Sequence, residues 1–228
     1  MPSLVTLATL RTKARQRADM ENSKFISDSE FNGIINDSAK ELYDLLTTTY
    51  EDYYWTTSSI SVVGGTDTYS LPSDFYKLLG VDEILNQSTG QSISLKPFMF
   101  AERNAYTQPQ VSYPVKLHYI PTMTEMVEDT DTFDGINGYE EYIIIDAAMK
   151  ALIKEESDPS ALMTQKQLMI KRIQGAAPNR DAGRGQRVTD IYNIDPFDYL
   201  QIPSRLRYHI VGNSIIFKQQ YNYGAVND

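Results

Sequence analysis

The stretch from Tyr139 to Ser157, YEEYIIIDAAMKALIKEES, constrains the fold of this chain more than any other. It is long enough for about five helical turns, and its apolar residues fall on nearly every side of such a helix. A helix with this pattern is surrounded by other elements. The run Ile143–Ile145 favours a strand locally, but residues 147–152 have high helix propensity. We therefore predict the central helix of a small bundle, too short and too charged at its ends to span a membrane.

Three further helices are predicted. The first covers about residues 3–18, with Ser3 as its N-cap. Its cations could contact phosphate or a membrane surface, although complementing the helix dipole is the simpler interpretation. These cations are Arg11, Lys13, Arg15 and Arg17.

The other two helices have clear start signals. In the helix expected over about 27–49, Ser27 and Glu30 form a capping box, each serving the other's end of the first turn. The helix expected from Asp158 to about Gly175 begins with a cap followed by proline.

Between Tyr50 and Met123 the apolar period changes from helical to alternating. This pattern predicts strands at 59–63, 68–71, 75–85, 92–95 and 115–120, and a short helix within 97–105. The fold class is therefore α+β: a four-helix bundle-like body (1–49 and 124–182), an inserted small antiparallel β-subdomain (50–123), and an extended C-terminal tail (183–228).

The tail is too apolar for a solvated, disordered end. Residues 206–218 are predicted to form a β-hairpin with a two-residue turn at Gly212-Asn213. An isolated hairpin is only marginally stable in water, so the tail either packs back on the body or orders against another chain. A polar hinge precedes it, which favours the second alternative. The hinge residues are Gly183, Arg184, Gly185 and Arg187; the residues predicted to bind another chain are Ile191, Tyr192, Ile194, Phe197, Tyr199, Leu200, Tyr208, Ile210, Ile216, Phe217, Tyr221 and Tyr223.

Charge is distributed unevenly along the chain, whose formal net charge is −9. Up to Ser157 there are 12 Lys and Arg against 24 Asp and Glu, whereas the remainder has 9 against 6. The acidic part argues against tight, sequence-specific nucleic-acid binding, which needs clustered cations. The asymmetry is either ordinary surface variation or a sign that the two parts face different partners.

Few residues point to chemistry. The chain has no cysteine and two histidines, which excludes thiol nucleophiles and disfavours a zinc site. Residues 129–135 resemble a calcium loop only superficially, because Phe133 stands where an oxygen ligand is required. Asp146, within the central helix, is the carboxylate expected to be buried with a raised pKa. A buried hydrogen bond or an ion pair with a neighbouring helix is a simpler role for it than catalysis. No nucleotide-binding or nucleophile motif is present, and we predict no metal or cofactor.

Targeting signals are also not evident. The N-terminal residues lack the charged-then-apolar pattern of a signal peptide, and no apolar run reaches membrane-spanning length. We therefore expect synthesis in the cytoplasm and no membrane partner.

Several short segments resemble the head-to-tail adaptor (connector) proteins of tailed phages, chiefly the short-tailed type. In the first half they are Arg17-Ala18-Asp19, Phe25–Glu30, Ile35-Asn36, Glu41–Leu46 and Tyr69–Phe75. In the second half they are Gly138–Ile143, Ala147-Ala148, Lys154–Ser157, Arg172-Ile173 and Arg180-Asp181-Ala182. The likeness covers about residues 4–182 and leaves the hairpin tail outside.

This resemblance implies a structural virion protein at the head–tail junction rather than an enzyme. Such adaptors form a ring, usually of twelve copies, that binds the portal protein after genome packaging. The ring extends the DNA channel, helps to retain the genome until ejection and docks the next tail component, such as a nozzle or fibre protein. A C-terminal extension commonly grips the portal. An acidic channel suits DNA that must slide without sticking.

Two other functions stay open at this point. A peptidoglycan-hydrolysing tail accessory protein would need a paired acid and base, for which Glu51 and Asp146 are candidates. A DNA-end-binding module would use Arg180, Arg184 and Arg187.

Overall fold

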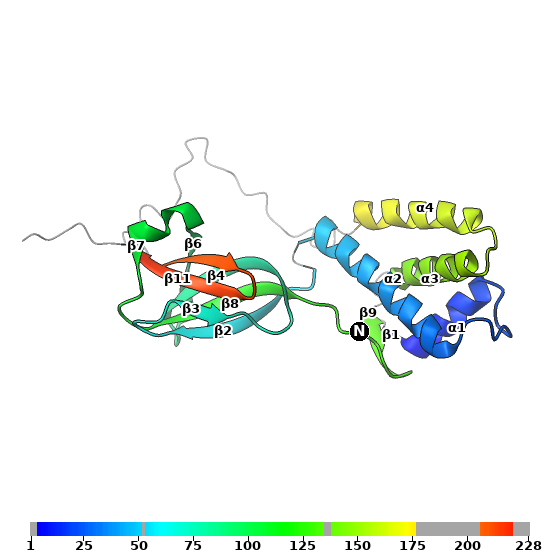
Figure 1. Ribbon diagram of the computed structural model, residues 1–228, viewed down its shortest axis with the longest axis horizontal. Coiled ribbons are helices and arrows are strands. Elements are labelled where there is room, and N and C mark those ends of the chain that lie inside the picture. The colour runs from blue at the N-terminus through cyan, green and yellow to red at the C-terminus, as the bar shows by residue number, and fades with distance from the viewer. Residues whose placement is uncertain (1–3, 52, 135–137, 177–205, 221–228) are drawn as a thin grey trace, which may run out of the picture. The chain divides into compact units, whose positions relative to one another are not determined.

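A computed structural model describes residues 4–51, 53–134, 138–176 and 206–220 (Figure 1). These residues form an α+β protein with four long helices, one short 3-10 helix and several small, mainly antiparallel sheets. The chain divides into two compact units. The helical unit comprises Met1–Tyr53 with Met123–Arg184, and the β unit comprises Tyr54–Thr122 with Gly185–Asp228.

The helical unit is organised around α3 (Glu140–Lys154). This helix contacts α1 (Leu7–Arg17), α2 (Asp28–Thr49) and α4 (Ser160–Ala176). All residues from Tyr142 to Ala148 are buried. The prediction of a central helix surrounded by other elements is confirmed.

The first helix begins later than predicted. Leu4–Thr6 form strand β1, which pairs antiparallel with β9 (Thr132–Asp134). Because these residues are extended, α1 starts at Leu7, and Thr6 rather than the predicted Ser3 is its N-cap, accepting a hydrogen bond from the Thr9 amide. The partner strand lies more than 120 residues further along the chain, so local propensity gave no sign of it.

The second helix starts where its capping box predicts, but only half of the box forms. The Ser27 side chain accepts a hydrogen bond from the Glu30 amide at 3.3 Å. The Glu30 carboxylate binds Lys154 of α3 instead of turning back to the cap. The start of α4 is confirmed: Asp158 accepts hydrogen bonds from both the amide and the hydroxyl of Ser160.

The β unit contains two sheets whose members are not consecutive in sequence. One has the order β2-β8-β4-β5, formed by Thr56–Val62, Tyr113–Pro121, Phe75–Asn86 and Gln91–Ser94. The other has the order β3-β11-β10-β6, with β7 also paired to β11. Its strands are Thr68–Ser70, Ser214–Gln220, Leu206–Val211, Lys96–Pro97 and Tyr106–Thr107. The short helix predicted within 97–105 is the 3-10 helix η1, Phe100–Ala105.

The C-terminal hairpin is confirmed, with β10 and β11 in register from Leu206↔Gln219 to Val211↔Ser214. Gly212 in its turn has φ of 56°, a left-handed conformation that glycine adopts without the penalty a side chain brings. The two sheets share one hydrophobic core, to which the hairpin contributes Leu206, Ile215 and Phe217, each fully buried. Figure 1 shows the hairpin, in orange and red, beside strands from the middle of the chain.

Candidate functional site

The predicted binding residues of the hairpin lie within the β unit. Phe217 has no exposed surface, and its ring packs edge-on against Tyr69 of β3 with centroids 5.8 Å apart. Tyr208 and Ile210 are partly buried and pack against the same core, and Ile216 is also partly buried. β11 pairs with β3 and β7, and β10 pairs with β6.

For residues 206–220, the expectation that the tail orders against another chain is therefore wrong. Strands of the same chain supply the hydrogen bonds and apolar contacts that an isolated hairpin lacks. The sequence of the hairpin indicates that it needs a partner surface, but it does not indicate which strands supply that surface. The hinge residues Gly183, Arg184, Gly185 and Arg187 lie outside the described residues, as do Ile191, Tyr192, Ile194, Phe197, Tyr199, Leu200, Tyr221 and Tyr223.

A network of charged side chains connects α2, α3 and α4. Asp146 of α3 is fully buried. Lys166 Nζ of α4 donates a hydrogen bond to Asp146 Oδ1 at 2.6 Å, and Lys150 Nζ lies 2.8 Å from Asp146 Oδ2. Both lysines also bind Glu41 of α2, at 2.8 Å from Lys150 and 3.0 Å from Lys166. The predicted buried ion pair is thus confirmed, and all three helices contribute to it.

The predicted direction of the Asp146 pKa is wrong. Burial opposes ionisation of this carboxyl, but hydrogen bonds from Lys150 and Lys166 outweigh that effect and lower its pKa. The same contacts raise the pKa of both lysines against the opposing effect of burial. Burial raises the pKa of the neighbouring Tyr142 hydroxyl to about 12. Asp146 is therefore an ionised structural group and is not poised to accept or donate a proton near neutral pH.

These shifts predict how the stability of the helical unit depends on pH. A carboxyl whose pKa is lower in the folded state contributes its full stabilisation of the fold above its unfolded-state pKa of about 3.9. This contribution is lost as the pH falls further, through the folded-state pKa. A lysine whose pKa is higher in the folded state contributes its full stabilisation of the fold below its unfolded-state pKa of about 10.4. This contribution is lost as the pH rises through the folded-state pKa. We expect a plateau between these limits and a decline on both sides, measured by urea unfolding monitored by circular dichroism at 222 nm.

The control for the acid limb is the Asp146→Asn variant, which removes the titrating group. Its stability should change less between about pH 5 and pH 2 than that of the unaltered chain, because the lowered carboxyl pKa is gone. An identical acid limb in both proteins would contradict the assignment of this limb to Asp146.

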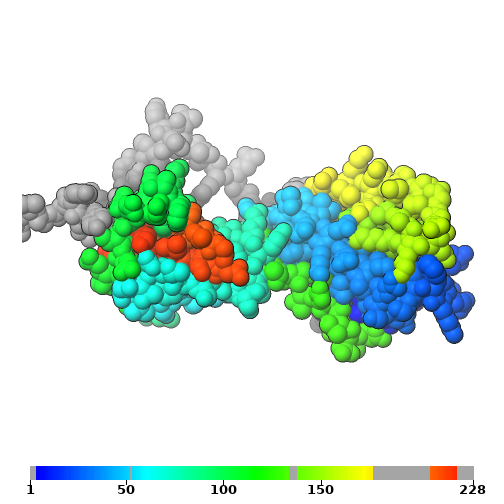
Figure 2. Space-filling model, viewed as in Figure 1, coloured from blue at the N-terminus to red at the C-terminus, as the bar shows by residue number. Residues whose placement is uncertain are grey.

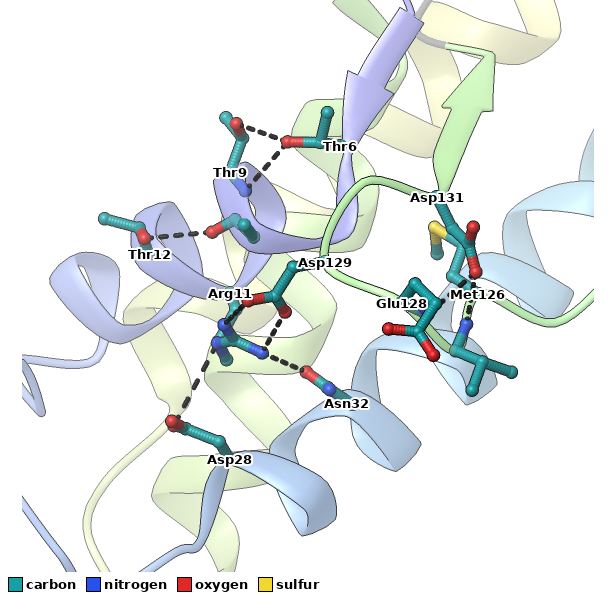
Figure 3. Close-up of polar contacts among 12 residues, drawn as sticks. Thr6, Thr9, Arg11, Thr12, Asp28, Asn32, Met126, Glu128, Asp129 and Asp131 are labelled. Atoms are coloured by element: carbon teal, nitrogen blue, oxygen red, sulfur yellow. Dashed lines mark hydrogen bonds and ion pairs between the residues drawn. The ribbon is translucent and has the colours of Figure 1, made fainter.

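The acidic segment before α3 is held against α1 and α2, as Figure 3 shows. Arg11 of α1 binds Asp129 through both terminal nitrogens, at 2.9 and 3.0 Å, and donates a second bond to Asn32 of α2 at 3.0 Å. Asn36, buried in α2, exchanges two hydrogen bonds with the backbone of Met126. The basic face of α1 therefore holds the fold together.

The calcium-like loop has a different role. Asp131 accepts hydrogen bonds from the amides of Val127 and Glu128, while the backbone carbonyls of Asp131 and Asp129 accept from Leu7 and Ala8. The loop carboxylates are thus occupied by amides and by Arg11. Within the described residues, no group of three or more His, Asp or Glu side chains is arranged to hold a metal ion.

Two further cations of α1 also bind groups of the same chain. Arg15 binds Asp28 at 2.9 Å and donates a bond to the Ile26 carbonyl at 2.8 Å. Arg17 binds Glu141 and Gln165. Arg15 and Arg17 also lie in the last turn of α1, where the predicted complement to the helix dipole requires cations.

A row of polar side chains crosses the outer face of the four-stranded sheet, and sequence reasoning did not anticipate it. Trp55 Nε1 donates to His118 Nδ1 at 3.1 Å, which leaves His118 Nε2 as the donor to Asp82 at 3.1 Å. Ser94 donates to the other Asp82 oxygen at 2.8 Å. The only available signal was that Asp82, Ser94 and His118 lie on the polar side of alternating strands.

Carboxylates that are adjacent in the sequence, such as Glu140-Glu141 and Glu155-Glu156, do not form a shared site in the described residues. Glu141 binds Arg17, while Glu155 and Glu156 are exposed at the end of α3. Glu51 is exposed at the end of α2, in the turn that leads into the β unit. Among the described helices, none is long and apolar enough to cross a bilayer.

Comparison with known families gives one match. The model of the SU10 adaptor protein family matches residues 5–190, which is most of the chain. A comparison with curated proteins gives no match. The match confirms the resemblance. The chain therefore belongs to the SU10 adaptor protein family and is a phage head-to-tail adaptor, a structural protein of the virion and not an enzyme.

Proposed function

We propose that the chain forms a ring, of twelve copies, that binds the portal protein after genome packaging. In this position it extends the DNA channel and offers a docking face to the next tail component. The observation that carries the proposal is the family match over residues 5–190. The three helices that contact α3 support a bundle-like body able to pack side by side in a ring.

The charge of the helical unit is consistent with a channel for DNA. Arg11, Arg15 and Arg17 bind carboxylates or carbonyls of the same chain, so they are not free to hold phosphate. An excess of acidic side chains would let DNA slide, because strong retention on a protein depends on clustered free cations.

The portal- or neighbour-binding role is proposed for those tail residues that do not complete the β-unit core. They are Ile191, Tyr192, Ile194, Phe197, Tyr199, Leu200, Tyr221 and Tyr223. Gly183, Arg184, Gly185 and Arg187 are proposed as the hinge that precedes them.

The test is assembly on the portal. Purified chain is mixed with purified portal protein, and the mass of the complex is measured by native mass spectrometry. We expect a discrete mass increment of about twelve chains per portal, because a closed ring has a fixed copy number. Unbound chain at every concentration, or a continuous range of masses, would contradict the proposal.

The alternatives from the sequence have no specific support in the structure. The buried Asp146 and the nearby Glu41 are both bound by Lys150 and Lys166, so neither carboxylate is free to act as an acid or base in hydrolysis. The arginines proposed for DNA ends, Arg180, Arg184 and Arg187, lie outside the described residues.

A further inference from the structure

The four-stranded sheet of the β unit has two edges, β2 and β5. β2 pairs with β8, β5 pairs with β4, and neither pairs with a further strand in the described part of the chain. An edge strand presents a row of amide and carbonyl groups that can pair with another chain. In Figure 2 the cyan surface to which β2 belongs is exposed along one side of the β unit.

Both edges lack the features that normally prevent such pairing. β2 reads Thr-Thr-Ser-Ser-Ile-Ser-Val and β5 reads Gln-Ser-Ile-Ser, with no charge and no proline. Natural edge strands are commonly protected by lysine, proline or extreme shortness. The β6 strand of the other sheet shows all three, since it consists of Lys96 and Pro97 alone. The opposite edge of that sheet, β3, has only three residues, so the longer uncharged edge strands, β2 and β5, both belong to the four-stranded sheet.

The directions of these strands suit a ring. Each neighbouring pair in the order β2-β8-β4-β5 is antiparallel, so β2 and β5 run in opposite directions. A second copy related by a small rotation keeps its strand directions, and its β5 lies antiparallel to the β2 of the first. Such a contact joins two different surfaces and repeats from copy to copy, as a closed ring requires.

The side chains at the two edges also match. Ser59 and Ser61 of β2 are exposed on the face away from the core, as are Ser92 and Ser94 of β5. Hydroxyl side chains that face each other across antiparallel strands stabilise the pair. Trp55 and Val63, at the two ends of β2, are 54% and 52% exposed and would be covered by a neighbour.

We propose that β2 of one copy pairs with β5 of a second copy, so that the four-stranded sheet continues from subunit to subunit. This inference rests on the proposed ring and specifies the surface through which neighbouring copies associate.

Cysteine cross-linking tests the contact, because the chain has no cysteine of its own. The variant carrying Ser59→Cys and Ser92→Cys is assembled on the portal and mildly oxidised. Paired positions on adjacent antiparallel strands come close enough for a disulfide. We expect a ladder of covalently linked chains that extends to the full ring, whereas each single variant gives no ladder.

A matched control carries Ser59→Cys with Ser70→Cys, an exposed serine on β3 at the edge of the other sheet. It should give at least roughly fivefold less linked product, because Ser70 is not at the proposed contact. Equal ladders in the two variants would overturn the inference. So would a dimer formed by the Ser59→Cys chain alone, which would indicate two-fold β2–β2 pairing.

Charge variants give a second measurement. Lysine at both Ser59 and Ser92 places like charges across the contact and should abolish ring formation, whereas Ser59→Lys with Ser92→Glu should restore it. Circular dichroism verifies that each variant is folded. If both the unaltered chain and the double-lysine variant form rings, the β2–β5 contact is overturned and the proposed ring is not. An unaltered chain that forms no ring would overturn the proposed function, and this inference with it.

Discussion

Replacing Asp146 with alanine is expected to lower the free energy of unfolding of the helical unit by about 3 kcal/mol. The carboxylate is fully buried and is the common partner of Lys150 and Lys166, whose side chains are 27% and 19% exposed. Without it, two cations stay in a largely desolvated position with Glu41 as their remaining partner. Breaking such a pair by removing one member costs more than the pair itself contributes, because a charge is left uncompensated.

The two units allow the effect to be localised. The single tryptophan, Trp55, belongs to the β unit, whereas the long helices dominate circular dichroism at 222 nm. In a urea titration, Asp146→Ala should shift the dichroism transition and leave the fluorescence transition in place. Removal of an exposed pair provides the matched control: Glu125→Ala, which leaves Lys40 at the surface, should leave the dichroism transition nearly unchanged. Equal losses in the two variants would show that burial of Asp146 is not what matters.

Replacing Phe217 with alanine is expected to lower the free energy of unfolding of the β unit by about 3–5 kcal/mol. Phe217 is fully buried among residues of both sheets, including Val62, Val81 and Leu117. Its removal leaves a cavity and takes away an aromatic contact with Tyr69. The measurement is the urea transition followed by Trp55 fluorescence.

This experiment also decides between the two roles considered for the hairpin. A hairpin that completes the core destabilises the isolated chain when its central aromatic residue is truncated. If instead the hairpin becomes ordered only on the portal, the same truncation would leave the stability of the isolated chain unchanged and would weaken only portal binding. The control is Val111→Ala, since Val111 is 55% exposed and should change the stability by less than about 0.5 kcal/mol. A result for Phe217→Ala as small as that of the control would contradict the core assignment.

Short-range features of this chain were predictable because their physical causes lie within a few residues. Ser27 caps α2 and Asp158 caps α4, since the cap and the amide it serves are two or three residues apart. Gly212 forms the tight turn of the hairpin because that turn needs a residue able to adopt positive φ. The surrounded position of α3 followed from apolar residues on all of its sides.

Features that depend on residues distant in sequence were not predictable in the same way. Glu30 binds Lys154 rather than its own cap, and residues 4–6 pair with β9 rather than extending α1. The pKa of Asp146 is lowered by Lys150, one turn along the same helix, and by Lys166 of another helix. Helix periodicity places Lys150 beside Asp146, but it gives no sign of Lys166.

The amino-acid sequence alone determined the positions of the main helices, the hairpin and its turn, and the likeness to phage adaptors, because propensity, capping and apolar period act over short distances. Only the tertiary structure decided that the hairpin joins β3, β6 and β7 in one sheet and shares its core with the other. The apolar residues of a strand indicate that another surface must cover it. Which surface covers it depends on the complete packing of the chain, where every candidate partner competes.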